Sequence, residues 1–236
     1  MRIGILGAGS MGRILAHHLV RLGHQVWVAN SRGPESLTAL AVEIGATPVS
    51  VVDAVKAGEV VVIAIPTKAV ADLPRALFSN VPSSAVVIDI SNYHPELRDG
   101  RSMRSTEACL TASGSGRPVI KAFNNILAKS LLERGVPRGT TGRIALSVAG
   151  DSLDAKATVL RLVDDLGFDP VDGGDLDSSW RQQPGTPAYC QDLEAAALRR
   201  ALAEADRSRI AEYRAEREAQ IRRDIAAQTT SDSARQ

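Results

Sequence analysis

The sequence predicts an α/β fold built on a doubly wound parallel sheet, with a small helical cap and arm at its C-terminal end. Short aliphatic runs alternate with helix-length segments along the first 90 residues, which is the order of a sheet whose parallel strands are joined by helices. Several runs are apolar at every position, as strands buried on both faces are. A hydrophobic fraction of 44% in 236 residues suffices for a sizeable core, and with 3% aromatic residues that core is aliphatic.

The expected elements follow one another in a regular order. Short aliphatic runs predict strands over residues 3–6, 26–29, 47–49, 60–65, 85–90, 119–123, 144–148 and 168–171. Segments of helical length lie over residues 11–22, 34–44, 51–57, 107–112 and 152–166. Gly23 and Gly45 are typical helix stops, and Pro34 suits a first helical turn. In the last of these helices one apolar face is expected at helical spacing, made of Leu153, Ala157, Leu160 and Val163 or Leu166.

The C-terminal segment differs in composition from the rest. Residues 192–227 contain no proline or glycine and are rich in Ala, Glu, Arg and Leu, which predicts one helix packed on the chain or on a partner subunit. Its apolar stripe comprises Leu198, Leu202, Ala205 and Tyr213. We expect a sheet domain over residues 1–175 and a cap with a long helical arm over residues 176–236.

Charge and cysteine content exclude several classes of protein. Twenty-eight basic and 27 acidic residues give a net charge of +1, which offers no electrostatic footprint for nucleic acid or an anionic membrane. The longest apolar run, Val60 to Pro66, is too short to span a bilayer, and the start of the chain does not resemble a signal peptide. Cys109 and Cys190 fit neither a disulfide framework nor a zinc site. We therefore expect a soluble, cytoplasmic protein without a metal site.

A glycine-rich motif joins the first strand to the first helix. Gly7 permits a tight turn, Gly9 lets the backbone approach a pyrophosphate, and Gly12 lets helix and strand pack closely. The N-terminus of the helix presents free N–H groups to the anion. A second strand follows about 20 residues later, which completes the context for a Rossmann-like dinucleotide-binding domain. The residues expected to bind the cofactor here are Gly7, Ala8, Gly9, Ser10, Met11 and Gly12.

The end of the second strand discriminates between the two nicotinamide dinucleotides. An NAD-selective site places Asp or Glu there to hold the ribose 2′-hydroxyl. This chain has Asn30, Ser31 and Arg32 instead, and the serine and arginine can donate hydrogen bonds to a 2′-phosphate. We therefore expect NADP selectivity, with a solvent-exposed turn as the alternative.

Further strand ends are expected to line the path of the ribose and nicotinamide, because ligands of open parallel sheets bind outside the carboxyl ends of the strands. In this way Asn124 could hydrogen-bond the nicotinamide or the second substrate. Alternatively, Asn124 and Asn125 cap a helix that begins near Ala128. The residues expected along the path are Ile65, Pro66, Thr67, Asn92, Ala122 and Asn124.

No catalytic residue can be assigned from the sequence. Reduction of a carbonyl or imine normally needs a proton donor, for which Lys121, Tyr93, His94 and Asp172 are candidates. His17 and His18 are expected to be packing or surface residues. Transfer of a hydride between a nicotinamide and a flavin-like ring needs little beyond positioning. The scarcity of acid–base groups therefore favours transfer between two cofactors.

The succession of motifs GILGAGSMG, ANSRGPESL, VVIAIP, VVIDISN, KAFNN, SVAGD and LGFDPVDGGDL resembles the coenzyme F-420-dependent NADP oxidoreductase family, from about residue 1 to residue 189. The resemblance implies NADP at Gly7–Gly12 and Asn30–Arg32. It also implies an 8-hydroxy-5-deazaflavin near the nicotinamide, beside Asn92, residues 122–124 and the turn at residues 185–187. A homodimer and a small C-terminal subdomain are further implications.

Two departures from that family bear on the acceptor. Archaeal members tend to carry histidine where this chain has Asn124, and they lack the charged helix after residue 192. We therefore expect an NADP(H)-dependent oxidoreductase that transfers a hydride to or from coenzyme F-420 or a similar acceptor. The alternatives are an NADPH-dependent reductase of a small C=N or C=O substrate or of a flavin, in which Lys121 or Tyr93 would act, and a non-catalytic NADP(H)-binding redox sensor.

Overall fold

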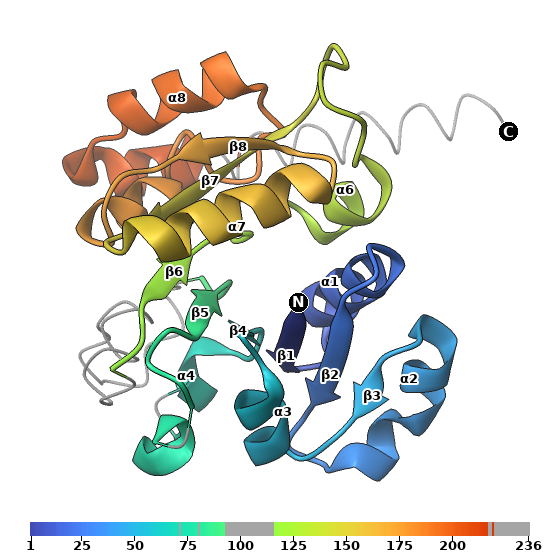
Figure 1. Cartoon of the computed structure of the whole chain (residues 1–236). Helices are drawn as coiled ribbons and strands as arrows, with labels where there is room; N and C mark the ends of the chain where they lie inside the picture. The colour runs from blue at the N-terminus through green and yellow to red at the C-terminus, as the bar shows by residue number, and fades with distance from the viewer. Residues whose placement is uncertain (71, 80, 93–115, 217–218, 220–236) are drawn as a thin grey trace, which may run out of the picture.

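The computed structural model describes residues 1–70, 72–79, 81–92, 116–216 and 219. Within them, eight strands form one sheet in the order β3-β2-β1-β4-β5-β6-β7-β8 (Figure 1). The strands are β1 (Arg2–Leu6), β2 (Gln25–Ala29), β3 (Thr47–Pro48), β4 (Val60–Ile63), β5 (Val86–Asp89), β6 (Val119–Lys121), β7 (Ala145–Gly150) and β8 (Asp169–Asp172). Each expected strand is present, so the α/β fold with a mostly parallel sheet is confirmed.

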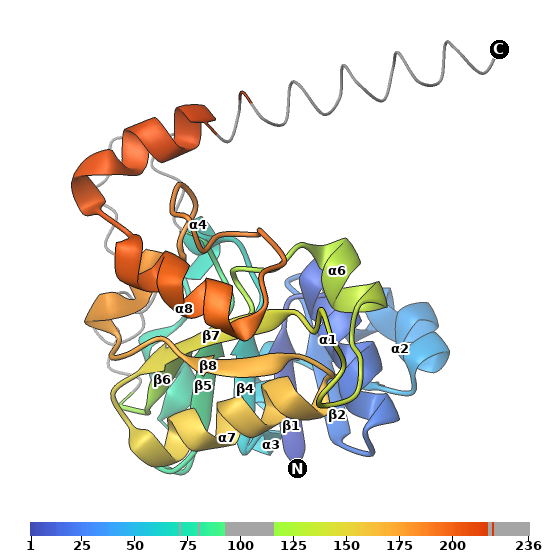
Figure 2. The same ribbon diagram turned by 90° about the horizontal axis from the view of Figure 1, so that it is seen from above.

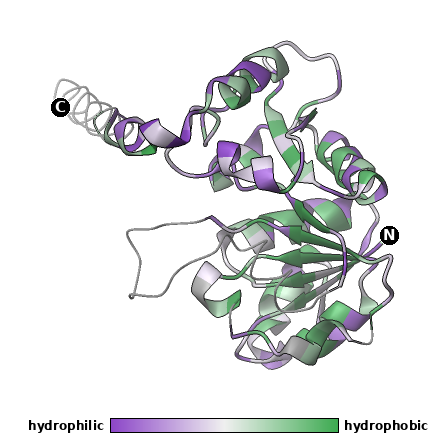
Figure 3. Cartoon of the chain, turned by 90° about the vertical axis from the view of Figure 1, so that its left-hand side faces the viewer, coloured by the Kyte–Doolittle hydropathy of each residue, from purple (hydrophilic) through white to green (hydrophobic). Residues whose placement is uncertain are grey.

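The helices cover both faces of the sheet. Val60 and Val62 of β4 share a core cluster with α1 and α7, whereas Val61 and Ile63 pack with α3 on the other face. Burial on both faces explains the uninterrupted apolar runs, and Figure 3 shows these hydrophobic strands between the helical layers. The helices are α1 (Ser10–Arg21), α2 (Thr38–Ile44), α3 (Val51–Ala57), α4 (Thr67–Val70), α6 (Ala128–Glu133), α7 (Leu153–Asp165) and α8 (Ala195–Glu204), with 3-10 turns at η1 (Pro34–Leu37), η2 (Arg75–Phe78), η4 (Asp177–Gln182) and η5 (Arg207–Arg209).

One strand pair departs from a parallel sheet. β7 runs antiparallel to β6, and β8 is parallel to β7. The registered pairs Ile120–Gly150 and Lys121–Ala149 join β6 to the C-terminal end of β7. The earlier residues of β7 therefore project beyond the carboxyl end of β6. We call β7, β8 and the helix α8 packed on them the platform, and Figure 2 shows α8 lying over β7 and β8.

The buried face of α7 differs in part from the one expected. Leu153 is 77% exposed, whereas Ala155, Val159, Leu162 and Val163 are buried against the sheet. Leu160 only flanks this cluster. The expected face was therefore right for Val163 and Leu166, which are buried, and wrong for Leu153.

The C-terminal segment is not one continuous helix within the described residues. α8 ends at Glu204, and helical structure resumes with η5 and residues 210–216. Asp206 accounts for the break, because its carboxylate accepts a hydrogen bond from the Ser208 N–H and so begins a new helical segment. The expected stripe holds for Leu198 and Leu202, which are buried against Ala145 and Val171 of the platform.

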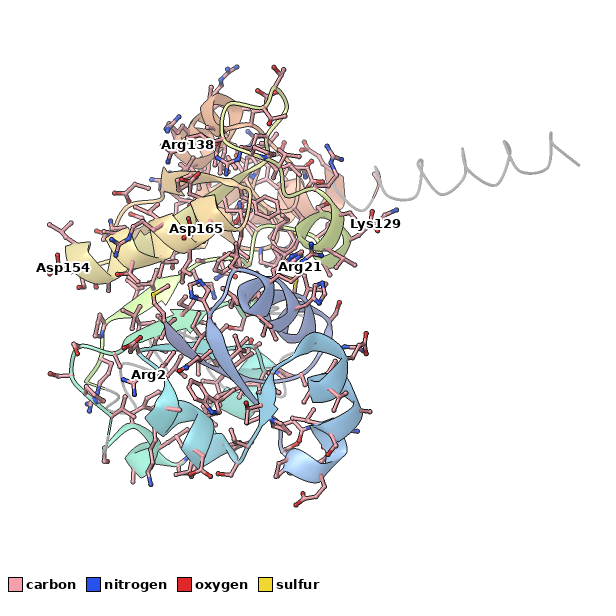
Figure 4. The ribbon with its side chains drawn as sticks, turned by 45° about the vertical axis from the view of Figure 1, so that its right-hand side comes forward. Arg2, Arg21, Lys129, Arg138, Asp154 and Asp165 are labelled. Atoms are coloured by element: carbon pink, nitrogen blue, oxygen red, sulfur yellow. The ribbon has the colours of Figure 1, made fainter. Side chains whose placement is uncertain are left out.

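Several expectations fall outside the described residues, namely the helix over 107–112, Cys109, Tyr93 and His94. In the described part, no helix is long and apolar enough to cross a membrane. Charged side chains of both signs are distributed over the exterior. Figure 4 labels six exposed examples: Arg2, Arg21, Lys129, Arg138, Asp154 and Asp165.

Candidate functional site

The glycine turn after β1 is tied to both neighbouring strands. Gly7 adopts a left-handed conformation (φ 109°), and its N–H donates to the Ala29 carbonyl at the end of β2 (2.8 Å). A Cβ at Gly7 would lie 2.2 Å from the carbonyl oxygen of Ala64, which follows β4. Neither the conformation nor the space admits a side chain. The turn therefore lies against the carboxyl ends of β2 and β4.

The other two glycines of the motif differ in what surrounds them. A Cβ at Gly12 would lie 2.0 Å from the Gly7 carbonyl oxygen, so this glycine permits the close approach of α1 to the turn. A Cβ at Gly9 would meet nothing within 4 Å. Packing within the described protein therefore does not require a glycine at position 9, whereas a pyrophosphate lying against the backbone there would.

The N-terminus of α1 suits an anion. Gly9 is its N-cap residue, no side chain caps it, and its first turn contains no acidic residue. The first N–H groups of a helix have no partner within the helix, and the helix dipole favours negative charge at this end. These amides belong to the expected residues Ser10, Met11 and Gly12. The arrangement fits a dinucleotide pyrophosphate.

The loop after β2 is organised by Asn30. Its Oδ1 accepts the Arg32 N–H (2.9 Å), and its Nδ2 donates to the Ser36 hydroxyl (2.9 Å). Ser31 and Arg32 are exposed. Among the described residues, the Arg32 guanidinium makes no hydrogen bond or ion pair. The loop therefore presents a cation and a hydroxyl where an NAD-selective site would carry a carboxylate.

A polar cluster joins the ends of β5 and β6 to the η4 segment. The Asn124 Nδ2 donates to the Asn92 Oδ1 (3.1 Å) and to the Gln182 carbonyl (2.8 Å), and the Gln182 Nε2 donates to the Asn124 Oδ1 (2.7 Å). The Asn92 Nδ2 lies 3.3 Å from the Tyr189 hydroxyl, and the Thr67 hydroxyl donates to the Asn92 carbonyl (2.8 Å). We call Thr67, Asn92, Asn124, Gln182 and Tyr189 the amide cluster.

The structure excludes one of the two interpretations of Asn124. The N-cap residue of α6 is Leu127, and no side chain caps this helix, so the capping alternative is wrong. Phe123 adopts a left-handed conformation (φ 59°) and turns the chain between β6 and Asn124. Asn124 itself is 2% exposed and held on both sides, by Asn92 and by Gln182.

The remaining residues expected along the path of the ribose and nicotinamide differ in how exposed they are. Pro66 is exposed and Ile65 half-buried just after β4, beside the glycine turn. Ala122 is fully buried in the core, so its side chain presents no surface to a ligand. Gln182 and Tyr189 were not expected. Gln182 ends η4 and Tyr189 lies in the segment after it; neither belongs to a motif that predicts a contact, and only the fold brings them to Asn92 and Asn124.

Lys121, one of the candidate proton donors, lies in the core. Its Nζ is 3.2 Å from a carboxylate oxygen of Asp89, and both side chains are 0% exposed. The same Nζ donates to the Ser91 carbonyl, while the Ser91 N–H donates to Asp89 (2.9 Å). A fully enclosed ion pair of this kind fixes the strand ends, and it does not reach a substrate.

Asp172, the other described candidate for the proton donor, is also bonded to other groups of the protein. It ends β8, the edge strand of the sheet, with β7 between it and β6. Its carboxylate accepts from Lys156 (2.9 Å) and from the Gly174 N–H (2.8 Å). In the described residues, no group of three His, Cys, Asp or Glu side chains is arranged to hold a metal ion.

A pocket of about 660 Å³ adjoins the amide cluster on the platform side. Its walls are the loop at residues 185–193, α8, and the helical residues 210–216. Tyr189 belongs to both sites, since it lines the pocket while its hydroxyl meets Asn92. The pocket includes the turn at residues 185–187 that the family resemblance implies for the second cofactor.

Comparison with known proteins identifies relatives of this architecture. Residues 2–93 match the family described as NADP oxidoreductase, coenzyme F420-dependent. The crystal structure of hypothetical protein SMa0349 from Sinorhizobium meliloti is 33% identical, covers 82% of this chain and 95% of its own, and superposes with a TM-score of 0.69. A protein from Arthrobacter sp. FB24, described as a proposed F420-dependent NADP reductase, is 26% identical with a TM-score of 0.63, over 76% of this chain and 87% of its own.

Metalloreductase STEAP3 of Rattus norvegicus is 31% identical over 179 residues, which are 75% of this chain and 35% of that protein. The chain spans between 31% and 56% of the length of the curated relatives that it matches. Together these matches extend the likeness from the glycine turn into the platform.

Proposed function

Since the chain belongs, through residues 2–93, to the NADP oxidoreductase, coenzyme F420-dependent family, we propose that it transfers a hydride between NADP(H) and a second ring system, with an 8-hydroxy-5-deazaflavin as the first candidate acceptor. That family is one of NAD(P)-binding oxidoreductases. The preference for NADP, the acceptor and a homodimeric state are our proposal.

One observation carries the proposal, namely the space at Gly9 beside the Asn30–Arg32 loop. The glycine turn is hydrogen-bonded to the end of β2, so the pyrophosphate position and the loop that would meet the ribose lie side by side. Arg32 supplies a positive charge with no protein partner among the described residues. A 2′-phosphate would satisfy that charge, whereas a 2′-hydroxyl would not.

The chemistry asks little of the protein beyond positioning. In the proposed direction a hydride leaves NADPH and bonds to the acceptor ring, NADPH becomes NADP⁺, and the acceptor takes one proton from water. The amide cluster, whose amides pair with one another, would form a wall of the nicotinamide site. The pocket beside Tyr189 would receive the acceptor. Lys121 is buried in an ion pair with Asp89, and Asp172 is bonded to Lys156 and to the Gly174 N–H. Neither of these two described candidates is therefore placed to donate a proton, which agrees with transfer to a ring that needs no protein acid.

The decisive experiment is anaerobic stopped-flow mixing of the NADPH-loaded protein with oxidised deazaflavin. Rapid loss of the deazaflavin absorption band, in step with oxidation of NADPH, is the expected result. If the band persists while NADPH is bound tightly in the same sample, the deazaflavin assignment is wrong. A panel of flavins, imines and carbonyl compounds then separates a reductase of another acceptor from a redox sensor, which would reduce none of them.

A second candidate acceptor is an ordinary flavin. Its ring system has the shape of a deazaflavin, so the same positioning against the nicotinamide would serve it. The same mixing experiment with oxidised riboflavin in place of deazaflavin tests it. Reduction of riboflavin alone would select this candidate.

A further inference from the structure

Arg13 lies in the first turn of α1, directly after the glycine motif, and it is exposed. Its backbone N–H donates to the Gly9 carbonyl (2.9 Å), which fixes the residue to the turn that would carry the pyrophosphate. Among the described residues, its guanidinium forms no hydrogen bond and no ion pair. The protein therefore presents, besides Arg32, a second cation at this edge of the sheet.

The face of α1 that carries Arg13 is turned towards α2. Residues seven apart lie nearly one above the other on a helix, so Arg13 shares its face with Val20. A Cβ at Gly45, the residue that ends α2, would lie 3.2 Å from the Val20 Cγ1, and this contact gives the direction of the face. Figure 2 shows α1 and α2 side by side. Arg13 therefore projects towards the segment that leads from β2 to α2.

That segment begins with the loop at residues 30–36, which is anchored near both of its ends. The Ala29 carbonyl just before it accepts from the Gly7 N–H, and Leu37 just after it is buried in one core cluster with Ala16 of α1. Side chains on a helix lean towards its N-terminus, so the Arg13 side chain extends back along α1 on the side of this loop. One cation from the helix and one from the loop thus border the space beside the glycine turn.

The loop also contains a carboxylate. The Glu35 Oε2 would lie 3.0 Å from a Cβ at Gly33, which places this carboxylate within the loop itself. The first turn of α1 has no acidic residue. Asp53 accepts from the Ser50 hydroxyl (2.6 Å) at the start of α3, and α3 packs on the opposite face of the sheet. Helix and loop therefore present two guanidinium groups and one carboxylate, and neither guanidinium is ion-paired with a described residue.

A 2′-phosphate has the charge and the oxygens to satisfy two guanidinium groups. A phosphate monoester carries about 1.5 to 2 negative charges at pH 7 and has three acceptor oxygens. The planar fork of one guanidinium engages two of those oxygens. The third oxygen and the remaining charge are left for a second cation.

We infer that Arg13 is a specificity-determining residue of the dinucleotide site, which binds the 2′-phosphate of NADP(H) together with Arg32. The inference rests on the NADP preference in the proposed function. It adds a residue that the glycine motif does not specify, since the motif ends at Gly12. The competing assignment is a contact of Arg13 with the pyrophosphate, which is common to NADP(H) and NAD(H), so a comparison of the two dinucleotides separates the assignments.

The test measures the affinities of NADP⁺ and NAD⁺ by isothermal titration for the full wild-type chain and for Arg13→Ala. The substitution should weaken NADP⁺ at least about fivefold and change NAD⁺ by less than about twofold, because only NADP⁺ carries the 2′-phosphate. Arg13→Lys keeps the charge without the planar fork, so its NADP⁺ affinity should lie between those of the wild type and of Arg13→Ala.

Arg21→Ala is the matched control, because Arg21 is an exposed arginine at the other end of the same helix (Figure 4). It lies about 12 Å further along α1, beyond a screening length of about 8 Å, and should change neither affinity. Adenosine 2′,5′-bisphosphate and 5′-AMP, which both lack the pyrophosphate, give a second measurement. Arg13→Ala should weaken binding of the bisphosphate and leave that of 5′-AMP unchanged.

Three results would overturn the inference: full NADP⁺ affinity in Arg13→Ala, equal weakening of NADP⁺ and NAD⁺, or the same loss in Arg21→Ala. The proposed function fails in other ways. Equal binding of the two dinucleotides by the wild-type protein would refute the NADP preference and the 2′-phosphate contact together. The expected selectivity without hydride transfer to any acceptor would contradict the proposed reaction and leave the role of Arg13 standing.

Discussion

The three glycines of one motif are required for three different physical reasons. Gly7 has a left-handed backbone against Ala64, Gly12 touches the Gly7 carbonyl, and Gly9 faces open space. Only the last of these has no role in the folded protein itself. Substitutions at these positions therefore separate stability from cofactor binding.

Gly9→Val should abolish binding of NADPH while changing the free energy of unfolding by less than about 1 kcal/mol. Gly12→Val should lower that free energy by more than about 3 kcal/mol, because its side chain would overlap the Gly7 carbonyl. Urea unfolding and NADPH fluorescence measure the two effects. Retained NADPH binding in Gly9→Val would refute the pyrophosphate assignment.

Arg32→Ala should weaken NADPH about 10- to 100-fold, since hydrogen bonds to charged groups contribute ~1.5–3 kcal/mol. Binding of NADH, which lacks the 2′-phosphate, should change by less than about twofold. Isothermal titration with both nucleotides checks this. An equal loss for the two would mean that Arg32 does not contact the 2′-phosphate.

His18 gives the protein a dependence of stability on pH. Burial in the first place, and then the neighbouring charge of His17, lowers the pKa of His18 from its ordinary value of 6.5. The unfolded chain therefore binds a proton more readily than the folded one. The free energy of unfolding should fall as the pH drops below about 6.5 and level off below the folded pKa.

His18→Gln should reduce that slope, which urea titrations between pH 8 and pH 5 would measure. His24 also has a pKa lowered by burial, so His24→Gln serves as a parallel variant whose contribution can be subtracted. If the change of unfolding free energy with pH is the same in both variants as in the wild type, groups other than these two histidines cause it.

At the scale of elements, the sequence predicted the presence of each helix better than it predicted which face of the helix is buried. Hydrophobic periodicity correctly located α7, and Ser152 caps it by accepting from the Ala155 N–H. Periodicity alone did not select which of its apolar residues are buried, because the choice is made by the sheet beneath it. The break at Asp206 was missed for a related reason, since a capping aspartate inside a strongly helical composition carries a weak local signal.

One pair of identical substitutions on α7 tests the buried face. Leu162→Ala should cost about 2–5 kcal/mol of unfolding free energy, because Leu162 is 2% exposed in the core. Leu153→Ala should cost less than about 0.5 kcal/mol, because Leu153 is 77% exposed. Equal costs in chemical denaturation would contradict the orientation of the helix.

At the scale of the whole molecule, local sequence patterns located the glycine turn and the loop after β2, but they did not predict the contacts that join distant segments. The glycine turn and the Asn30–Arg32 loop are each contiguous in sequence, so their chemistry could be predicted. The amide cluster joins Asn92 to Tyr189, which are 97 positions apart, and the ion pair of Asp89 with Lys121 spans 32. Such pairings depend on strand order and register, which composition does not encode.

Removal of residues 192–236 should expose the apolar surface of Ala145 and Val171 that α8 covers. We expect the truncated protein to have a different mass in light scattering from the full chain, which we expect to be a homodimer. An identical oligomeric mass would show that the removed segment is not part of a subunit interface.

The short overlap between β6 and β7 bears on how such a molecule can diverge. Two registered residue pairs join the platform strands to the parallel sheet, and side-chain packing, with the hydrogen bonds of Gln182 to Asn124 and Ser147, adds to the attachment. Packing tolerates substitution far more readily than a long hydrogen-bonded ladder does. The family match ends at residue 93, ahead of this junction. A lineage can therefore keep the half that carries the glycine turn and exchange the platform, which in our proposal receives the acceptor.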